Sequence, residues 1–275
     1  MSTLGECSFA AGRAFDSIAE AYDQLFTNSK VGRTQRDVVW QRAANLFPAG
    51  GHILELNCGT GEDAVFFAER GIEVTACDAS VLMIHQARTR QRRDGSRPIQ
   101  FHVLPSERIN ELSSPEMFDG AFSNFSGLNC IADLALIARK LARRMKSGAP
   151  VLLCLSTRFC VWEMLHYTFR GDLHRAFRRC AGNSQVSIGS ESFPVYYPTL
   201  RSVARSFHPF FRFRSATGVG VVVPPSYMEA WVVKNPPLFR FCNAIDRLIR
   251  GLPGIRVLGD HMLLHLERVW KWKHC

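Results

Sequence analysis

The sequence predicts an α/β protein with a doubly wound core, in which helices cover both faces of a mostly parallel sheet. From residue 51, short apolar runs alternate with stretches whose apolar residues recur at helical spacing. Such alternation implies right-handed crossovers between parallel strands. The composition, with 47% hydrophobic and 21% charged residues, suits a packed core and argues against global disorder.

The core elements follow from these runs in order. The expected strands are His52–Asn57, Ile72–Cys77, Ile99–Leu104, Phe118–Phe125 and Pro150–Leu155. The expected helices between them are Glu62–Arg70, Ser80–Arg93 and Ile131–Lys146. The last helix has a basic final turn and is followed by Gly148, which is typical of a helix end.

The two flanks of this core follow different patterns. Before it, the predicted helices Ala14–Phe26 and Val31–Phe47 could cap the sheet or fold over its ligand edge. After Leu155 we expect a basic, aromatic helix over 159–179, a hairpin over Gln185–Tyr197, a helix over Thr199–Phe207, a strand over Phe210–Val223, a helix near Phe239–Arg250 and a closing strand over His261–Arg268. The prediction is a single domain over 1–275, with a lid (1–50), a core (51–157), an insertion (158–260) and the closing strand (261–268).

Charge and cysteines narrow the class of protein. The net charge of +10 favours anionic partners such as nucleic acid, a membrane surface or an acidic small molecule, without choosing among them. The nine cysteines are odd in number and never spaced C-x-x-C, so neither a metal site nor a disulfide framework is expected. With no apolar run of roughly 18 residues and no secretory pattern at the start, we expect a cytoplasmic protein.

The segment ILELNCGTGED (53–63) joins a buried strand to a helix through a Gly-x-Gly turn. Gly59 and Gly61 let the backbone approach a ligand, although such a turn can also be a simple connector. The dinucleotide fingerprint lacks its third glycine, and the phosphate loop lacks its lysine. Glu62 and Asp63 would repel a pyrophosphate, so a nucleoside without phosphates is favoured.

Asp78 ends the second strand, 17 residues after Gly61. An acid at that carboxyl edge suits the two hydroxyls of a ribose. It would also serve as the N-cap of the helix that starts near Ser80.

With these residues, the block ILELNCGTGEDAVFFAERGIEVTACDASVLMIHQAR (53–88) resembles the cofactor motifs of class I S-adenosylmethionine-dependent methyltransferases, in the small-molecule, type 11-like branch. The segments AFDSIAEAYDQLF (14–26), FDGAFSNFSGLNCI (118–131), LARRMKSGAPVLLCL (141–155) and LGDHMLLHLER (258–268) resemble further parts of that family. The resemblance implies a Rossmann-like sheet of seven strands, a helical N-terminal lid and a large insertion after strand five.

The same resemblance implies S-adenosylmethionine as the cofactor and methyl transfer to the oxygen, nitrogen or carbon of a small, apolar or aromatic acceptor. The alternatives are an RNA or protein methyltransferase, which the positive charge would suit, and a cofactor-binding module without transfer activity.

The resemblance also assigns cofactor contacts to matching positions. Glu55, Asn57, Gly59 and Gly61 would line the methionine and ribose, and Asp78 would hold the ribose hydroxyls. Ala79 and Met83 would border the adenine, and Ser106 and Glu107 would meet its amino group. Asn124 and Phe125 would lie beside the sulfonium, and Tyr22 would close over the cofactor. Two positions depart from the pattern. Asn57 replaces a glycine but tolerates left-handed backbone angles, and Pro105 stands where an Asp is commoner.

The acceptor side stays open. Side chains of the basic, aromatic helix could cover an apolar substrate, rest on a membrane surface or pack in the core: Trp162, Leu165, Phe169 and Phe177. Candidates for a general base are His166, Tyr196, Tyr197, His208 and His261. We assign no catalytic residue, because alignment alone can supply most of the rate of methyl transfer.

Two further patterns have plain interpretations. The arginine run formed by Arg88, Arg90, Arg92, Arg93 and Arg97 is expected to be a solvated helix face, so nucleic acid is not an expected partner. The fragment NPPL (235–238) resembles a motif of amino-methyltransferases, but a Pro-Pro turn entering a helix explains it better. The sequence does not predict the oligomeric state.

Overall fold

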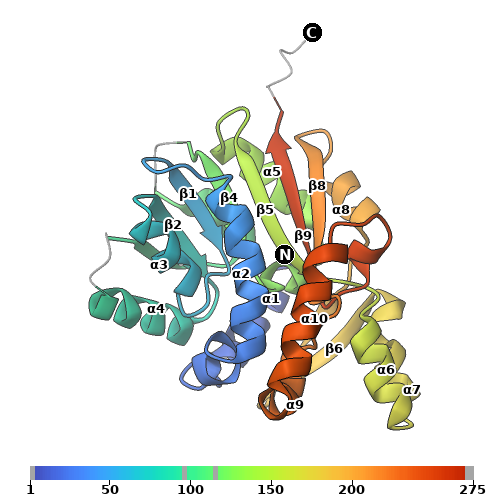
Figure 1. The fold of residues 1–275 in the computed structure, drawn as a ribbon. Coiled ribbons are helices and arrows are strands. Elements are labelled where there is room, and N and C mark those ends of the chain that lie inside the picture. Colours follow the sequence, from blue (N-terminus) through green and yellow to red (C-terminus); the bar gives the residue numbers. More distant parts are fainter. Residues whose placement is uncertain (1–3, 95–97, 114–116, 270–275) are drawn as a thin grey trace.

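The computed structural model describes residues 4–94, 98–113 and 117–269, and its centre is a seven-stranded sheet in the order β3-β2-β1-β4-β5-β9-β8 (Figure 1). The strands are β1 (His52–Leu56), β2 (Glu73–Asp78), β3 (Gln100–Val103), β4 (Gly120–Ser123), β5 (Pro150–Ser156), β8 (Phe211–Val219) and β9 (His261–Arg268). β1 to β5 pair in parallel, while β9 runs antiparallel between β5 and β8. The predicted doubly wound, mostly parallel sheet is confirmed.

The strand order reverses at β1, which pairs with β2 on one side and with β4 on the other. Leu56 at the end of β1 lies opposite both Cys77 and Ser123. The turns that follow β1, β2 and β4 therefore meet at one edge of the sheet. In open α/β sheets this switch point is where ligands bind.

Helices cover both faces of the sheet, as its almost fully buried strands require. One face is covered by α2 (Lys30–Ala44), α3 (Glu62–Glu69) and α4 (Val81–Asp94), and the other by α5 (Leu134–Arg144) and α8 (Leu200–Phe207). Phe66 and Ile84 pack with Phe122 in the first core, and Leu141 and Phe207 pack in the second. These two apolar layers hold the switch point rigid.

The first predicted helix is wrong in its bounds. Helix α1 covers Leu4–Asp16, and after a turn a π-helical segment covers Asp23–Thr27. The hydroxyl of Ser17 donates to Ala14 O at 2.7 Å, and such a local bond competes with helix continuation. The Asp16 carboxylate accepts a hydrogen bond from Leu82 N at 2.8 Å. It therefore bonds the first turn of α4, and helix α1 ends at this residue.

The predicted single helix over 159–179 is also wrong. It is divided into α6 (Val161–Phe169) and α7 (Leu173–Phe177). Gly171 between them has φ +74°, a left-handed angle that suits glycine, and Asp172 caps α7 by accepting from Arg175 N at 2.9 Å. These two residues explain the break.

The remaining elements surround the ligand edge. The hairpin β6 (Asn183–Ile188) and β7 (Glu191–Tyr196) forms a separate sheet that packs on α1. α9 (Glu229–Lys234) and α10 (Pro236–Ile249) pack near α2. Prolines occupy the first turn of α10, so the predicted Pro-Pro entry into a helix is confirmed. In the part of the chain that the structure describes, no helix is long and apolar enough to cross a membrane.

Candidate active site

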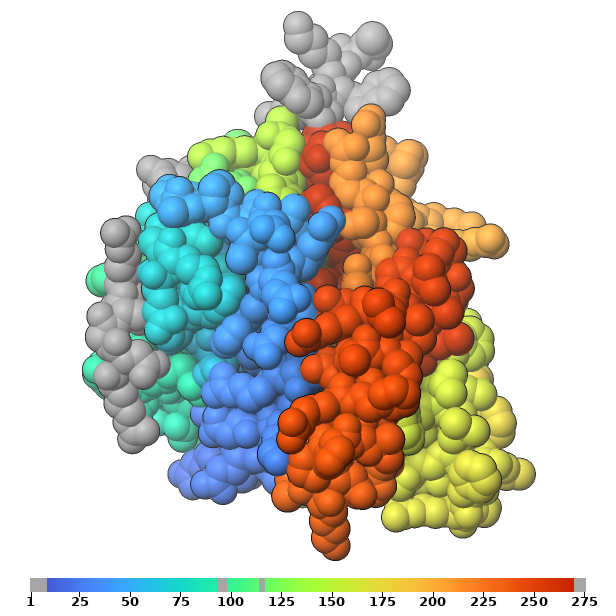
Figure 2. All heavy atoms as spheres, viewed as in Figure 1, coloured from blue at the N-terminus to red at the C-terminus, as the bar shows by residue number. Residues whose placement is uncertain are grey.

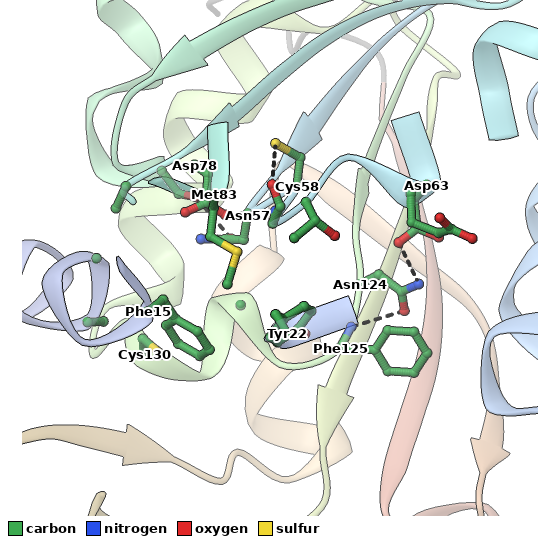
Figure 3. Close-up of a pocket in the computed structure, with 18 of the residues that line it drawn as sticks. Phe15, Tyr22, Asn57, Cys58, Asp63, Asp78, Met83, Asn124, Phe125 and Cys130 are labelled. Carbon is green, nitrogen blue, oxygen red and sulfur yellow. Dashed lines mark hydrogen bonds between the residues drawn. The ribbon is translucent and has the colours of Figure 1, made fainter. Parts of the chain in front are cut away.

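A cavity lies at the switch point, bordered by the N-terminal segment (Figure 3). It is lined by Ala11, Gly12, Phe15, Tyr22, Arg36, Asn57, Cys58, Gly59, Thr60, Glu62, Asp63, Asp78, Ala79, Met83, Ser106, Asn124, Phe125, Gly127, Cys130 and Ile131. We call it the cofactor cavity.

Most of the residues predicted to hold a cofactor line this cavity. They are Tyr22, Asn57, Gly59, Asp78, Ala79, Met83, Ser106, Asn124 and Phe125. Glu55, Gly61 and Glu107 lie outside its lining. Contact with a ligand stays a prediction for all twelve residues.

The turn after β1 has the backbone that a close ligand approach requires. Asn57 has φ +55° and Gly59 has φ +53°, so Asn57 adopts the left-handed angles that we expected it to tolerate. Gly61 has φ +78° and begins α3, and a Cβ added there would lie 2.8 Å from the Cβ of Ala87. Gly61 therefore serves the packing of α3 on α4 and does not line the cavity.

Asp78 connects the end of β2 to the turn after β1. Its Oδ2 accepts from Gly59 N at 2.9 Å and its Oδ1 from Ser80 N at 2.8 Å. Burial raises the pKa of this carboxyl, and the two backbone donors oppose that effect. Asp78 thus bonds the chain just before α4 and also faces the cavity, so both expected roles are compatible.

A buried ion pair lies at the other end of the cavity, as seen from Asp78 in Figure 3. Arg36 of α2 is 4% exposed, and its Nη1 is 2.5 Å from Asp63 Oδ2. Asp63 also accepts from Trp40 Nε1 at 2.6 Å and from Asn124 Nδ2 at 3.0 Å. Burial disfavours the guanidinium charge, but Asp63 outweighs it and raises the pKa of Arg36. This end of the cavity therefore carries a charged guanidinium paired with a carboxylate.

The sequence reasoning missed Arg36. The sequence did carry one indication of its role. Arg36 is a charged residue on the buried face of α2, and the same face carries Gly32, Val39 and Ala43 at helical spacing. The Nε of Arg36 has no hydrogen-bond partner among the described residues, which leaves a donor for a ligand.

The carboxylates of Glu62 and Asp63 after the turn are neutralised by arginines. The expected repulsion between these two carboxylates and a pyrophosphate is therefore wrong. Asp63 pairs with Arg36, and Glu62 pairs with both Arg33 and Arg90. These carboxylates therefore do not make the turn strongly anionic.

Arg90 is not part of a solvated face, so that prediction is wrong for this residue. It donates to Thr60 O at 2.8 Å and also bonds Asp23, which joins the N-terminal segment to the turn. The side chains of Arg93 and Arg97 lie outside the described residues.

Glu55 lies in β1 behind the turn and is 1% exposed. Its Oε2 has no hydrogen-bond partner among the described residues. Burial, followed by the neighbouring Asp63, raises the pKa of this carboxyl well above its ordinary value. A cationic ligand group near it would reverse that preference.

A second cavity adjoins the first, and Tyr22 and Phe125 line both. It is lined by Ile18, Tyr22, Leu25, Phe26, Phe125, Ser156, Glu163, Arg178, Arg179, Pro225, Ser226, Tyr227, Asp260 and His261. The N-terminal segment contributes apolar and aromatic side chains, whereas α6, the segment after α7 and the start of β9 contribute polar ones. We call it the acceptor cavity.

The shared wall has a strained backbone. Phe125 and Ser126, directly after β4, both have left-handed angles, with φ +42° and +69°. The strain persists because Phe125 N donates to Asn124 Oδ1 at 3.0 Å and the hydroxyls of Ser126 and Ser156 are 2.6 Å apart. Such outliers cluster at functional sites.

The polar wall is one buried network. Arg179 donates to Glu163 Oε2 at 2.6 Å and to Asp260 Oδ1 at 3.0 Å, and Arg178 Nε donates to Glu163 Oε1 at 2.7 Å. Asp260 Oδ2 lies 3.5 Å from Nδ1 of His261. Burial lowers the pKa of His261, and Arg179 adds to this while Asp260 opposes it. His261 is therefore neutral near pH 7.

Among the five candidate bases, His261 is the one in the lining of the acceptor cavity. Tyr196 and Tyr197 line a different pocket, beside Arg158. His208 is exposed after α8. His166 packs on Tyr227, with ring centroids 5.2 Å apart, outside that lining.

The aromatic side chains expected to cover a substrate do not line either cavity. Trp162 donates its indole N–H to Val222 O at 2.9 Å, while Leu165, Phe169 and Phe177 are exposed. Helix α6 turns Glu163 toward the acceptor cavity, so Trp162, Leu165 and Phe169 lie elsewhere on that helix, and Phe177 lies on α7. Among the residues that the structure describes, no group of three or more His, Cys, Asp or Glu side chains could hold a metal.

Comparison with known proteins is consistent with this geometry. A family model described as a methyltransferase domain matches residues 53–148. The demethylmenaquinone methyltransferase of Thermobifida fusca is 29% identical over 143 residues, which are 51% of this chain and 58% of that enzyme. YqeM of Bacillus subtilis, whose name assigns it provisionally to the methyltransferases, is 33% identical over 181 residues, 63% of this chain and 70% of YqeM.

Solved structures share the fold across nearly the whole chain. The cyclase SpnF has a TM-score of 0.64 at 14% identity and covers 96% of this chain and 97% of its own. A methyltransferase of Clostridium acetobutylicum has a TM-score of 0.59 at 11% identity, with 93% and 99% covered. At such identities the likeness shows the fold alone. The match to the T. fusca enzyme spans little more than half of that protein, so its substrate does not transfer to this chain.

Proposed function

Because the chain belongs to the class I S-adenosylmethionine-dependent methyltransferases, we propose that it transfers a methyl group from S-adenosylmethionine to a small acceptor with an aromatic or apolar body. One observation supports this most strongly. The cofactor cavity and the acceptor cavity adjoin at Tyr22 and Phe125, which line both. Ligands bound in the two cavities would meet beside these two side chains.

The residues present fit S-adenosylmethionine. Asp78 would hold the ribose hydroxyls, with Ala79 and Met83 beside the adenine. Arg36, whose Nε has no partner among the described residues, would hold the methionine carboxylate at the far end. The buried carboxyl of Glu55, behind the same turn, would favour the methionine ammonium.

When bound, this cofactor supplies a methyl group on a positively charged sulfur, ready for in-line displacement. The chain's own contribution is placement. The rings of Tyr22 and Phe125 at the junction would attract a cation and keep water away. The N-terminal segment, pinned to the turn by the hydrogen bond from Thr60 to Asp23 (2.7 Å), would hold the acceptor in line.

His261 would accept a proton from an attacking hydroxyl or amine. Its Nδ1 lies 3.5 Å from Asp260 Oδ2 and has no hydrogen-bond partner among the described residues. With the ring proton on Nδ1, Nε2 would be the atom that takes up the proton. The network of Glu163, Arg179 and Asp260 would hold the ring in place, as supporting groups do for other catalytic histidines.

Calorimetric titration with S-adenosylmethionine, S-adenosylhomocysteine and NAD tests the cofactor assignment. We expect both sulfur nucleosides to bind and NAD not to bind. Tight binding of NAD without binding of S-adenosylhomocysteine would contradict the proposal. Radiolabelled methyl transfer to a panel of phenols, hydroxyquinones and carboxylic acids then tests the acceptor class, with His261→Asn as the comparison enzyme.

A further inference from the structure

Two groups of helices expose apolar stripes that no part of the described chain covers. In α6 and α7, Val161, Leu165, Phe169, Leu173 and Phe177 recur every four residues, and all are exposed, Phe169 to 86%. Large side chains at such spacing normally face a core. Here they face away from it.

Helix α10 repeats the pattern. Leu238, Phe241 and Leu248 are 47%, 61% and 79% exposed and follow one another at spacings of three and seven residues. An adjoining stripe of the same helix, which includes Phe239 and Cys242, is buried. Helix α10 is therefore apolar on its inner side and on an adjoining outer side.

Helices α6 and α9 are neighbours, and α9 is followed directly by α10. The rings of Trp162 in α6 and Trp231 in α9 are 6.5 Å apart, and Tyr227 before α9 contacts His166 of α6. Figure 1 places α6, α7, α9 and α10 at one end of the molecule, and Figure 2 shows this end from the side of α10. We call the exposed stripes of α6, α7 and α10 the apolar end face.

The charges of these helices are almost all positive where they meet solvent. The four carboxylates are already engaged: Glu163 pairs with Arg178 and Arg179, Asp172 caps α7, Glu229 accepts from Lys30 N and Val31 N, and Asp246 accepts from Val221 N and Val222 N. The exposed cations Arg170, Lys234, Arg240 and Arg247 form no ion pair with any described residue.

We propose that the apolar end face docks on the surface of an anionic phospholipid bilayer, with Phe169, Phe241 and Leu248 entering the headgroup region and the arginines meeting lipid phosphates. Exposed Phe and Leu beside unpaired Arg and Lys is the composition of helices that lie in the membrane interface.

Charge complementarity favours a bilayer over a second copy of the chain. A symmetric dimer through this face would bring the unpaired arginines of both copies together, and like charges in such contact are unfavourable. An anionic bilayer satisfies both the apolar and the cationic groups.

The face also borders the acceptor cavity, because Arg178 and Tyr227 line that cavity and lie beside α6. Docking would bring the cavity close to the lipid, so an amphiphilic acceptor could enter from the bilayer. This last step rests on the proposed function, whereas the docking itself does not.

Vesicle flotation tests the docking. The protein is mixed with vesicles of equimolar phosphatidylglycerol and phosphatidylcholine, or of phosphatidylcholine alone, at about 50 and about 500 mM NaCl. We expect flotation with the anionic vesicles that weakens with salt. Phe169→Asp and Leu248→Asp should each reduce the partition coefficient about tenfold, and Arg240→Gln with Arg247→Gln should reduce it about thirtyfold on anionic vesicles.

Matched controls lie elsewhere on the molecule. Val103→Asp on β3, at the opposite edge of the sheet, and Arg143→Gln on α5 should leave flotation unchanged. Titration with S-adenosylhomocysteine reports folding and cofactor binding of every variant separately. Docking is refuted if wild-type protein stays with the unbound fraction, if the control variants lose as much binding as the others, or if sedimentation shows a dimer that Leu248→Asp dissociates.

Discussion

Asp78→Ala should weaken binding of the cofactor's demethylated product at least tenfold, about 1.4 kcal/mol. The carboxylate already orders the site by accepting from Gly59 N and Ser80 N at 2.9 and 2.8 Å. A hydrogen bond to a charged group contributes about 1.5–3 kcal/mol, and two ribose hydroxyls could use the remaining lone pairs. Tenfold is therefore the lower bound.

Two nucleosides separate this effect from damage elsewhere. S-adenosylhomocysteine carries the ribose and the amino-acid tail, whereas 5′-methylthioadenosine carries the ribose without that tail. Titration calorimetry should show equal losses for both ligands in the Asp78→Ala variant, and a thermal melt shows whether the variant is folded at the titration temperature. An unchanged dissociation constant in a folded variant would refute the ribose assignment.

Three further variants test the rest of the site. Arg36→Gln should weaken S-adenosylhomocysteine at least tenfold (about 1.4 kcal/mol) and leave 5′-methylthioadenosine unaffected, because only the first has a carboxylate; equal losses would refute the carboxylate role. Gly61→Ala should lower the free energy of unfolding by about 1–3 kcal/mol more than Gly148→Ala, since both sites have left-handed φ but only Gly61 would bring a Cβ to 2.8 Å from Ala87. His261→Gln should make unfolding less sensitive to acid: burial lowers the pKa of His261, so the unfolded chain binds more protons and the wild-type protein loses stability as pH falls through about 6.5. Denaturant melts at pH 7.5 and 5.5 measure this, and an equal loss in both proteins would refute it.

The cofactor end of the site could be predicted because its determinants are local. Gly59 and Asp78 act through backbone angles and strand ends, which a short stretch of sequence specifies. Nine of the twelve predicted residues line the cavity for this reason. Glu55, Gly61 and Glu107 do not line it. Glu55 lies within β1 behind the turn, and Gly61 is packed against Ala87 of α4.

The acceptor end could not be predicted, since it forms through contacts between distant segments. Arg179 bonds Asp260, 81 residues later in the chain, and Tyr22 lines the same cavity as the turn after β4. No periodicity in 159–179 distinguishes the inward Glu163 from the outward Phe169. That distinction depends on how α6 packs against the segment before α9, which only the assembled fold determines.

Asn57 shows how a local departure from a family pattern becomes tolerable. The left-handed backbone alone would accept asparagine at a small cost, as its φ of +55° indicates. Its side chain also needs space and a partner, which come from two other strand ends. Gly127 leaves the space, because a Cβ there would lie 2.2 Å from the Cβ of Asn57, and Ser106 donates to Asn57 Oδ1 at 3.1 Å. A glycine at position 57 would leave that space empty and the Ser106 donor without this partner. Asn57 therefore departs from the family pattern and yet connects the loops after β1, β3 and β4 around the cofactor cavity.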